Sequence, residues 1–235
     1  SNSYPILAWQ QSEDSGPDPP AAPDCNVVSY TGSGTAGDPY AIDNIDQLQC
    51  IRFQDPSASY EVTSNIDAKT TAVWNDNSGF DPIGSNSVPF TGTLDGNGYE
   101  IQGLTIDRGS DTGLFGVSSG TIRDVNITEA LIKGDDDTGV VVGDNDGGTV
   151  NSTSATGTVN AGFGDVAGGL VGRNDGTIAY SDASVDVSTG GQDEQGGLVG
   201  RNAGSISHSY ATGSVDGTND IGGLVGYNTQ SGSVA

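Results

Sequence analysis

Acidic side chains recur just ahead of a set of glycine-rich blocks in this 235-residue chain. If successive blocks stack on one another, the carboxylates form a column of like charges, which is costly unless cations lie between them. Carboxylate oxygens are the ligands that Ca²⁺ prefers, so calcium is a candidate ligand, although no EF-hand loop is present and a generally acidic surface accounts for the same residues. No other cofactor is expected. The column consists of Asp136, Asp137, Asp165, Asp193, Glu194 and Asp220.

Carboxylate pairs can also cleave sugars, because glycosidases place two of them roughly 5 to 10 Å apart. The chain has 26 aspartates, so pairs at this spacing arise by chance, and the sequence singles none of them out. His208 is the only histidine, and neither a Ser/His/Asp arrangement nor an HExxH motif surrounds it. The sequence therefore predicts no catalytic residue and a protein that is not an enzyme.

Two covalent modifications can also be predicted from the sequence, a disulfide and N-glycosylation. Cys25 and Cys50 are the only cysteines, and we predict a disulfide between them, with two buried free thiols as the alternative. A zinc site is disfavoured because the single histidine is far away in sequence. Asn126 and Asn151 begin N-x-[ST] sequons and are candidate glycosylation sites, although about three such sequons would arise by chance.

Charge excludes several classes of partner. The chain has 31 acidic and 7 basic residues, a net charge of −24, and the basic residues are scattered singly, which excludes nucleic-acid binding. No apolar run reaches the about 18 residues that span a bilayer, so no membrane insertion is expected in this segment. The excess of Asp and the scarcity of Lys are typical of a high-salt organism. An ordinary acidic secreted protein and a calcium-loaded protein are the alternatives.

The glycine-rich blocks are copies of one repeat: TGVVVGDN, AGGLVGRN, QGGLVGRN and IGGLVGYN, with a weaker copy, DTGLFG. Their closing glycines lie 27, 29, 28 and 26 residues apart, and short β-type segments separate them. A period near 28 residues without a long helix fits one coil of a parallel β-helix, whereas a propeller blade needs about 40. We expect the glycines to permit positive φ at corners. The closing asparagines predict a hydrogen-bonded ladder: Asn145, Asn174, Asn202 and Asn228.

Aligned copies also predict interior columns, and small residues in one of them suit a narrow interior where three sheets converge. On the surface, Asp144 and Arg173 occupy equivalent positions one copy apart and could form an ion pair between coils. The interior columns are Ile122, Val150, Ile178 and Ile206; Ile127, Ala155, Ala183 and Ala211; and Leu131, Val159, Val187 and Val215.

The GGLVGRN and GGLVGYN blocks resemble the GLUG motif of repetitive bacterial and archaeal surface proteins, which include filamentous adhesins. Residues 32–51 and 89–116 resemble the coils that lead into such arrays, so the resemblance covers about residues 25–235. It implies a β-helical architecture at the cell surface. It implies no active site, because a structural repeat defines the family.

The predicted fold class is all-β, a right-handed parallel β-helix with a short capping helix over residues 45–53, N-capped by Asp43 or Asn44. The bulky aromatics Trp74, Phe80, Phe90, Tyr99 and Phe115 are expected in the core, with an exposed sugar-stacking platform as the alternative. The predicted organisation is a closing segment of a preceding module (1–10), a Pro-rich acidic linker (11–24), cap and lead-in coils (25–115) and GLUG-type repeats truncated at the C-terminal end (116–235).

These features together predict an extracellular, cell-surface structural or adhesive protein of a halophilic microbe, a stalk, filament segment or adhesin. Its expected partners are cell-surface or matrix components, including glycans, or further copies of itself. The alternative is a secreted module that binds or cleaves polysaccharide. That alternative needs a groove with exposed aromatics and a local departure from repeat regularity.

Overall fold

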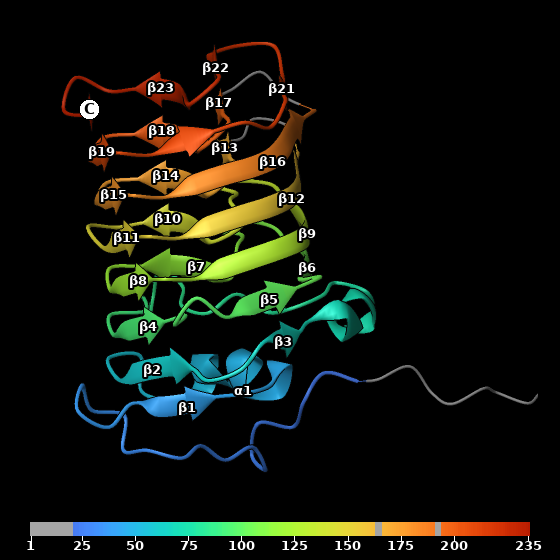
Figure 1. Ribbon diagram of the computed structural model, residues 1–235. Helices are drawn as coiled ribbons and strands as arrows, with labels where there is room; N and C mark the ends of the chain where they lie inside the picture. The colour runs from blue at the N-terminus through green and yellow to red at the C-terminus, as the bar shows by residue number, and fades with distance from the viewer. Residues whose placement is uncertain (1–20, 163–165, 191–193) are drawn as a thin grey trace, which may run out of the picture.

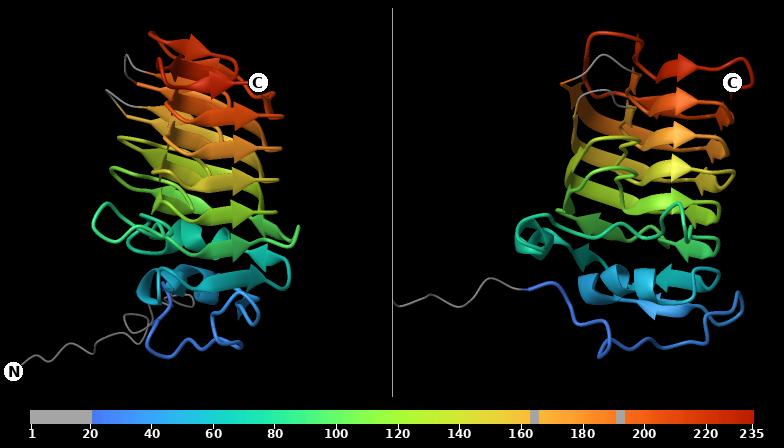
Figure 2. Two further views of the ribbon diagram at one scale, coloured as in Figure 1. Left: turned by 90° about the vertical axis from the view of Figure 1, so that its left-hand side faces the viewer. Right: turned by 180° about the vertical axis from the view of Figure 1, so that it is seen from behind.

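Parallel strands stacked along one axis dominate the described part of the chain (Figure 1). The computed structural model describes residues 21–162, 166–190 and 194–235. The predicted closing segment 1–10 and most of the linker 11–24 lie outside these residues. With the axis upright, the long strands at the front run from left to right while the chain climbs, and the strands behind them run back again (Figures 1 and 2). The chain is therefore a right-handed parallel β-solenoid, as predicted.

Each regular coil contributes one strand to each of three long sheets. The first sheet contains β1 (Tyr40–Ile42), β2 (Ser59–Val62), β4 (Thr93–Asp95), β8 (Thr121–Arg123), β11 (Thr149–Asn151), β15 (Thr177–Ala179), β19 (Ser205–Ser207) and β24 (Ser233–Val234). The second contains β3 (Ile66–Asp67), β5 (Glu100–Gln102), β9 (Asn126–Gly134), β12 (Ser154–Ala161), β16 (Asp182–Thr189) and β20 (Tyr210–Ala211), with β6 (Thr105–Asp107) paired to β9 and β21 (Val215–Asp216) to β16.

The third sheet carries the second half of each glycine-rich block. It contains β7 (Phe115–Ser118), β10 (Val142–Asn145), β14 (Val171–Asn174), β18 (Val199–Asn202) and β23 (Val225–Asn228). Three two-residue strands at the start of the blocks form a small fourth sheet: β13 (Ala167–Gly168), β17 (Gln195–Gly196) and β22 (Ile221–Gly222).

The predicted capping helix lies at the N-terminal end of the stack, behind β1 and β2 in Figure 1. It is α1 (Ile45–Cys50), continued by the 3₁₀ turn η2 (Ile51–Phe53); a second turn, η3 (Lys69–Val73), follows later. Asn44 is the N-cap, and its Oδ1 accepts a hydrogen bond from the Gln47 amide. Leu48 and Ile51 are buried, so the helix packs its apolar side on the open end of the solenoid.

Strand register confirms the first two interior columns and corrects the third. Val159 pairs with Ile132, not with Leu131, because β9 has one more residue than β12 between its second and third column positions. Glu129 absorbs the extra residue with φ +54°, leaving Leu131 on the surface. Gly157 lies opposite this β-bulge, where a Cβ would come 2.1 Å from the Ala130 carbonyl oxygen, so only glycine fits.

The asparagine ladder is confirmed and buried. The Asn145 side-chain amide donates to Asn174 Oδ1 at 2.6 Å, and equivalent bonds of 2.8 Å continue to Asn202 and Asn228. The first three of these side chains are at most 1% exposed. Each amide therefore satisfies its neighbour inside the corner, which ties successive coils together.

The predicted positive φ is found at corner glycines such as Gly98 and Gly147, with φ of +72° and +79°, but at none of the block glycines. A Cβ at Gly172 would lie 2.5 Å from the Thr138 amide nitrogen of the preceding coil, and one at Gly143 would lie 2.6 Å from the Asp111 carbonyl carbon. These glycines are therefore required for close approach between backbones.

Candidate functional site

The acidic residues ahead of the blocks follow a register that the structure fixes. Parallel bridges join Thr112 to Thr138 and Thr138 to Ala167, and the pairing continues to Gln195 and Ile221. The residues one position earlier therefore stack in successive coils. This column reads Asp111, Asp137, Val166, Glu194 and Asp220.

The predicted acidic column is thus interrupted rather than continuous. Val166 separates Asp137 from Glu194, which pairs with Arg201 at 3.3 Å, and Asp220 is exposed at the last coil. Asp136 is an exposed neighbour of Asp137. The predicted calcium ligands Asp165 and Asp193 lie outside the described residues.

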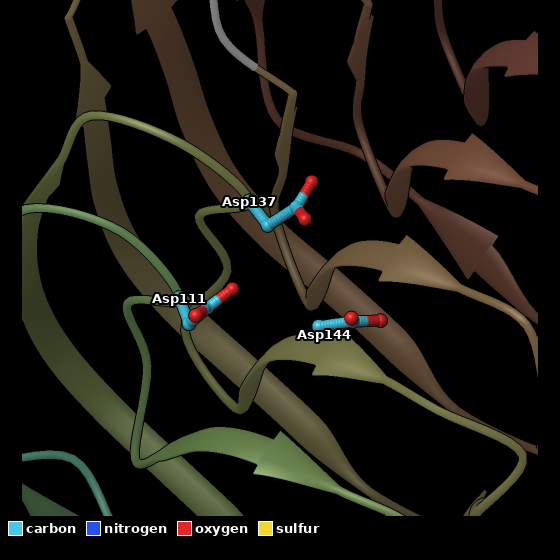
Figure 3. Close-up of side chains that lie close together, drawn as sticks. All are labelled: Asp111, Asp137 and Asp144. Atoms are coloured by element: carbon cyan, nitrogen blue, oxygen red, sulfur yellow. The ribbon is translucent and has the colours of Figure 1, made fainter. Parts of the chain in front are cut away.

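Three aspartates gather at the N-terminal end of this column. One carboxylate oxygen from each of Asp111, Asp137 and Asp144 lies within 4.8 Å of the other two. Asp111 and Asp137 lie on loops of adjacent coils, and Asp144 lies on β10, with all three carboxylates projecting the same way (Figure 3). We call these three residues the aspartate cluster.

Local backbone geometry places the cluster. Asp111 and Asp137 both have positive φ, +53° and +23°, which short polar side chains tolerate better than most. The Thr112 amide donates to the Asp137 carbonyl oxygen at 3.1 Å, which stacks the two loops. Because Gly143 has no Cβ, the loop that carries Asp111 lies directly against β10. The block glycine and the two left-handed aspartates thus act together to bring the carboxylates close.

Burial and mutual repulsion dominate the electrostatics of the cluster. Burial raises the pKa of Asp137 to about 7, Asp144 adds to the rise, and the Arg173 guanidinium opposes it. Burial likewise raises the pKa of Asp144 to about 6, against the influence of Arg173. The pKa of Asp111 is raised by burial and by Asp136, while a hydrogen bond from Asn86 lowers it.

Arg173 lies in register with Asp144, as expected, but its ion pair goes elsewhere. Its guanidinium contacts Asp175 of the same coil at 2.9 Å. Asp144 Oδ1 is buried and lacks a hydrogen-bond partner within the described part of the chain. The cluster therefore keeps carboxylate oxygens free, and it can lower its repulsion by holding a proton or by holding a hard cation.

The sequence prediction found Asp137 and missed the other two members of the cluster. Asp111-Thr112-Gly113 repeats Asp137-Thr138-Gly139 letter for letter, so aligning the weak first copy at its beginning would have found Asp111. Asp144 was recognised as a surface residue, but its closeness to Asp111 and Asp137 depends on Gly143 and on how the loops fold against β10, which the sequence does not show.

The remaining predicted site residues are placed as follows. Cys25 and Cys50 form a disulfide with a Cα–Cα distance of 5.4 Å, which joins the N-terminal segment to the end of α1. Asn126 Oδ1 accepts a hydrogen bond from Ser154 Oγ at 2.9 Å. Asn151 donates to Ser152 Oγ at 2.9 Å. Both sequons lie at corners of the first and second sheets.

Comparison with known proteins supports the repeat assignment. Residues 196–216 match the family described as the GLUG motif. The chain is 40% identical over 128 residues to halomucin of the haloarchaeon Haloquadratum walsbyi, and 34% identical over 102 residues to a Gly-rich protein of Evansella cellulosilytica provisionally described as a membrane protein. These matches cover 49% and 41% of this chain but only 1% and 12% of the two relatives. The chain therefore carries GLUG-type repeats, as predicted.

A solved structure shares the fold. It is a Bacteroides ovatus protein provisionally described as an immunoglobulin A1 protease, with a TM-score of 0.70 and 24% identity, and the match covers 86% of this chain and 66% of that one. At this identity the likeness shows the fold alone. Among the described residues, no helix is long and apolar enough to cross a membrane.

Proposed function

We propose that this chain is a non-enzymatic, rod-like segment of an extracellular cell-surface protein from a high-salt organism, acting as a stalk, filament segment or adhesin. The observation that carries the proposal is the unbroken parallel register, in which eight strands of the first sheet stack along the axis. Backbone hydrogen bonds run along that axis, so tension or bending must break them coil by coil.

Two observations support an extracellular place. The Cys25–Cys50 disulfide is typical of an oxidising compartment. The relatives carry names, halomucin and Gly-rich membrane protein, that refer to mucins and membranes.

The net charge of −24 suits a brine, where salt screens repulsion between neighbouring acidic faces. The proposed partners are surface or matrix components, glycans, or further copies of the chain.

Surface labelling tests this proposal. An antibody raised against the purified chain should label intact cells of the source organism in their native brine, and mass spectrometry should find the parent protein in the cell-surface fraction. Detection only after lysis would contradict the extracellular placement. Release of the segment into spent medium as a short single module would favour the carbohydrate-active alternative.

The aspartate cluster supports a second candidate function, polysaccharide cleavage. One carboxylate oxygen of Asp137 lies within 4.8 Å of one of Asp144, and burial raises both pKa values toward neutrality, so this pair can hold one proton between two carboxyls, the arrangement that glycosidases use. Incubation with a panel of polysaccharides tests this function by the release of reducing ends. Cleavage that disappears in Asp137→Asn would support it, and equal product from wild type and Asp137→Asn would exclude this cluster as its site.

A further inference from the structure

The corner between the first and second sheets has one left-handed residue in each regular coil. Asp124, Ser152, Tyr180 and His208 have φ values of +54°, +51°, +51° and +50°. They stack in register, since the Ser152 amide donates to Ala179 and the Tyr180 amide to Ser207 of the next coil. A tyrosine in this conformation is unusual, so its presence in place of glycine or asparagine calls for a reason. We call these four residues the corner column.

A shallow, open groove lies beside Asp124 and Ser152 of the corner column and is lined by residues of three successive coils. Its volume is about 490 Å³. Asn126 Oδ1 accepts from Ser154 Oγ, and the Asn126 amide nitrogen keeps its donors free among the described residues. The lining offers hydroxyl, amide and carboxylate groups and no basic side chain. Its polar members are Asn97, Asp124, Asn126, Ser152 and Ser154.

In the next two coils the corner column carries aromatic rings, which follow Ser152 along the axis beyond the lining of the groove. The Tyr180 and His208 rings are stacked, with centroids 4.8 Å apart and planes 21° from parallel. His208 lies one coil further along the axis, so the opposite face of Tyr180 is turned back toward Ser152 and the groove. Tyr180 is 62% exposed, and Tyr210, which lies in the His208 coil in register with Asp182, is 58% exposed.

We propose that the groove and the Tyr180 face form a binding site for a neutral glycan that runs along the solenoid axis. A sugar ring presents C–H groups to an aromatic face and hydroxyls to surrounding polar groups, and this corner supplies both within neighbouring coils. The absence of basic residues from the lining and the presence of Asp124 disfavour an acidic sugar. The inference rests on the proposed function, because an extracellular stalk meets glycans.

Binding to immobilised neutral polysaccharides, a mannan and a β-glucan, tests the proposal in molar salt with the full chain, and polygalacturonate serves as the acidic comparison. Tyr180→Asn removes the ring and suits a positive φ, so the fold is retained, and we expect about tenfold weaker binding. Tyr180→Phe should bind as wild type does. Tyr227→Ala, which removes a 41% exposed tyrosine on β23 of the third sheet, should leave binding unchanged.

Three results would overturn the site: wild type that binds neither neutral polysaccharide, wild type that binds polygalacturonate alone, or equal affinities for wild type and Tyr180→Asn with unchanged circular dichroism. Any of these together with positive surface labelling would leave the structural function standing. Absence from the cell surface, by contrast, would remove the proposed function whatever the chain binds in solution.

Discussion

The two halves of the solenoid are stabilised in different ways. Residues 21–115, which we call the cap region, bury the largest side chains, among them Trp74, Tyr60, Phe80 and Phe90, and vary in coil shape. Residues 116–235, the repeat region, fill the interior with Val, Ile, Leu and Ala, and rely on glycines where backbones meet. Varied aromatic packing tolerates irregular coils, whereas a regular stack requires the same small residue at each close approach.

Removal of a large aromatic from the cap region should have the greatest effect. Phe90 is 1% exposed and contacts Tyr60 and Phe115, with ring centroids 6.2 and 4.8 Å away. Phe90→Ala should lower the free energy of unfolding by about 3 to 5 kcal/mol in urea titrations. Phe53→Ala is the matched control, because Phe53 is 66% exposed, and it should change stability by less than about 0.5 kcal/mol. Equal effects would contradict the packing described.

The disulfide should come next and act on the cap region alone. Cys25→Ser combined with Cys50→Ser should cost about 3 kcal/mol, because the link closes a loop in the unfolded chain. Hydrogen exchange should quicken in α1 and β1 and stay unchanged in β14 and β18. Uniformly faster exchange along the axis would show that the two regions unfold as one unit.

In the repeat region, the sharpest test is a single methyl group. Gly172→Ala should cost about 2 kcal/mol, because the added Cβ meets backbone of the preceding coil. Gly37→Ala is the control, since no heavy atom lies within 4 Å of its added Cβ. If thermal unfolding is alike for the two variants, close approach is not the reason for the motif glycine.

Proton binding to the aspartate cluster should give a smaller, pH-dependent effect. The folded-state pKa of Asp137, about 7, lies above its ordinary value of 3.8, so the folded state binds this proton more tightly than the unfolded state does. The resulting stabilisation of the folded state is complete below about pH 4 and is lost as the pH rises through 7. Without divalent cations, unfolding experiments should show wild type losing about 1 to 2 kcal/mol more than Asp137→Asn between pH 5 and 8, after discounting for solvent screening. Parallel pH profiles for the two proteins would contradict the assigned burial.

Calcium should produce the smallest shift. At pH 8, millimolar Ca²⁺ should raise the melting temperature of wild type by a few degrees, because a bound cation stabilises the folded state. EDTA should reverse the shift, and Asp144→Asn should abolish it. An unchanged melting temperature in wild type would remove calcium as a ligand of the cluster.

The difference between the two regions also explains what the sequence could predict. Repetition fixes register, so the asparagine ladder and the Ile122 and Ile127 columns followed from alignment alone. The error at Leu131 arose because a single extra residue was absorbed by a bulge, which alignment by hydrophobicity does not detect. The aspartate cluster combines two loops with a strand, and the Tyr180–His208 stack depends on backbone φ, so both needed coordinates.

Pulling a single chain from its two ends tests most directly whether this solenoid works as a mechanical element. We predict that the repeat region extends in successive steps of about one coil, roughly 90 to 100 Å each for about 28 residues, and that the cap region resists as a separate, larger unit. Extension of the whole chain in one event, or at low force without coil-sized steps, would contradict a rod built from stacked, separately held coils.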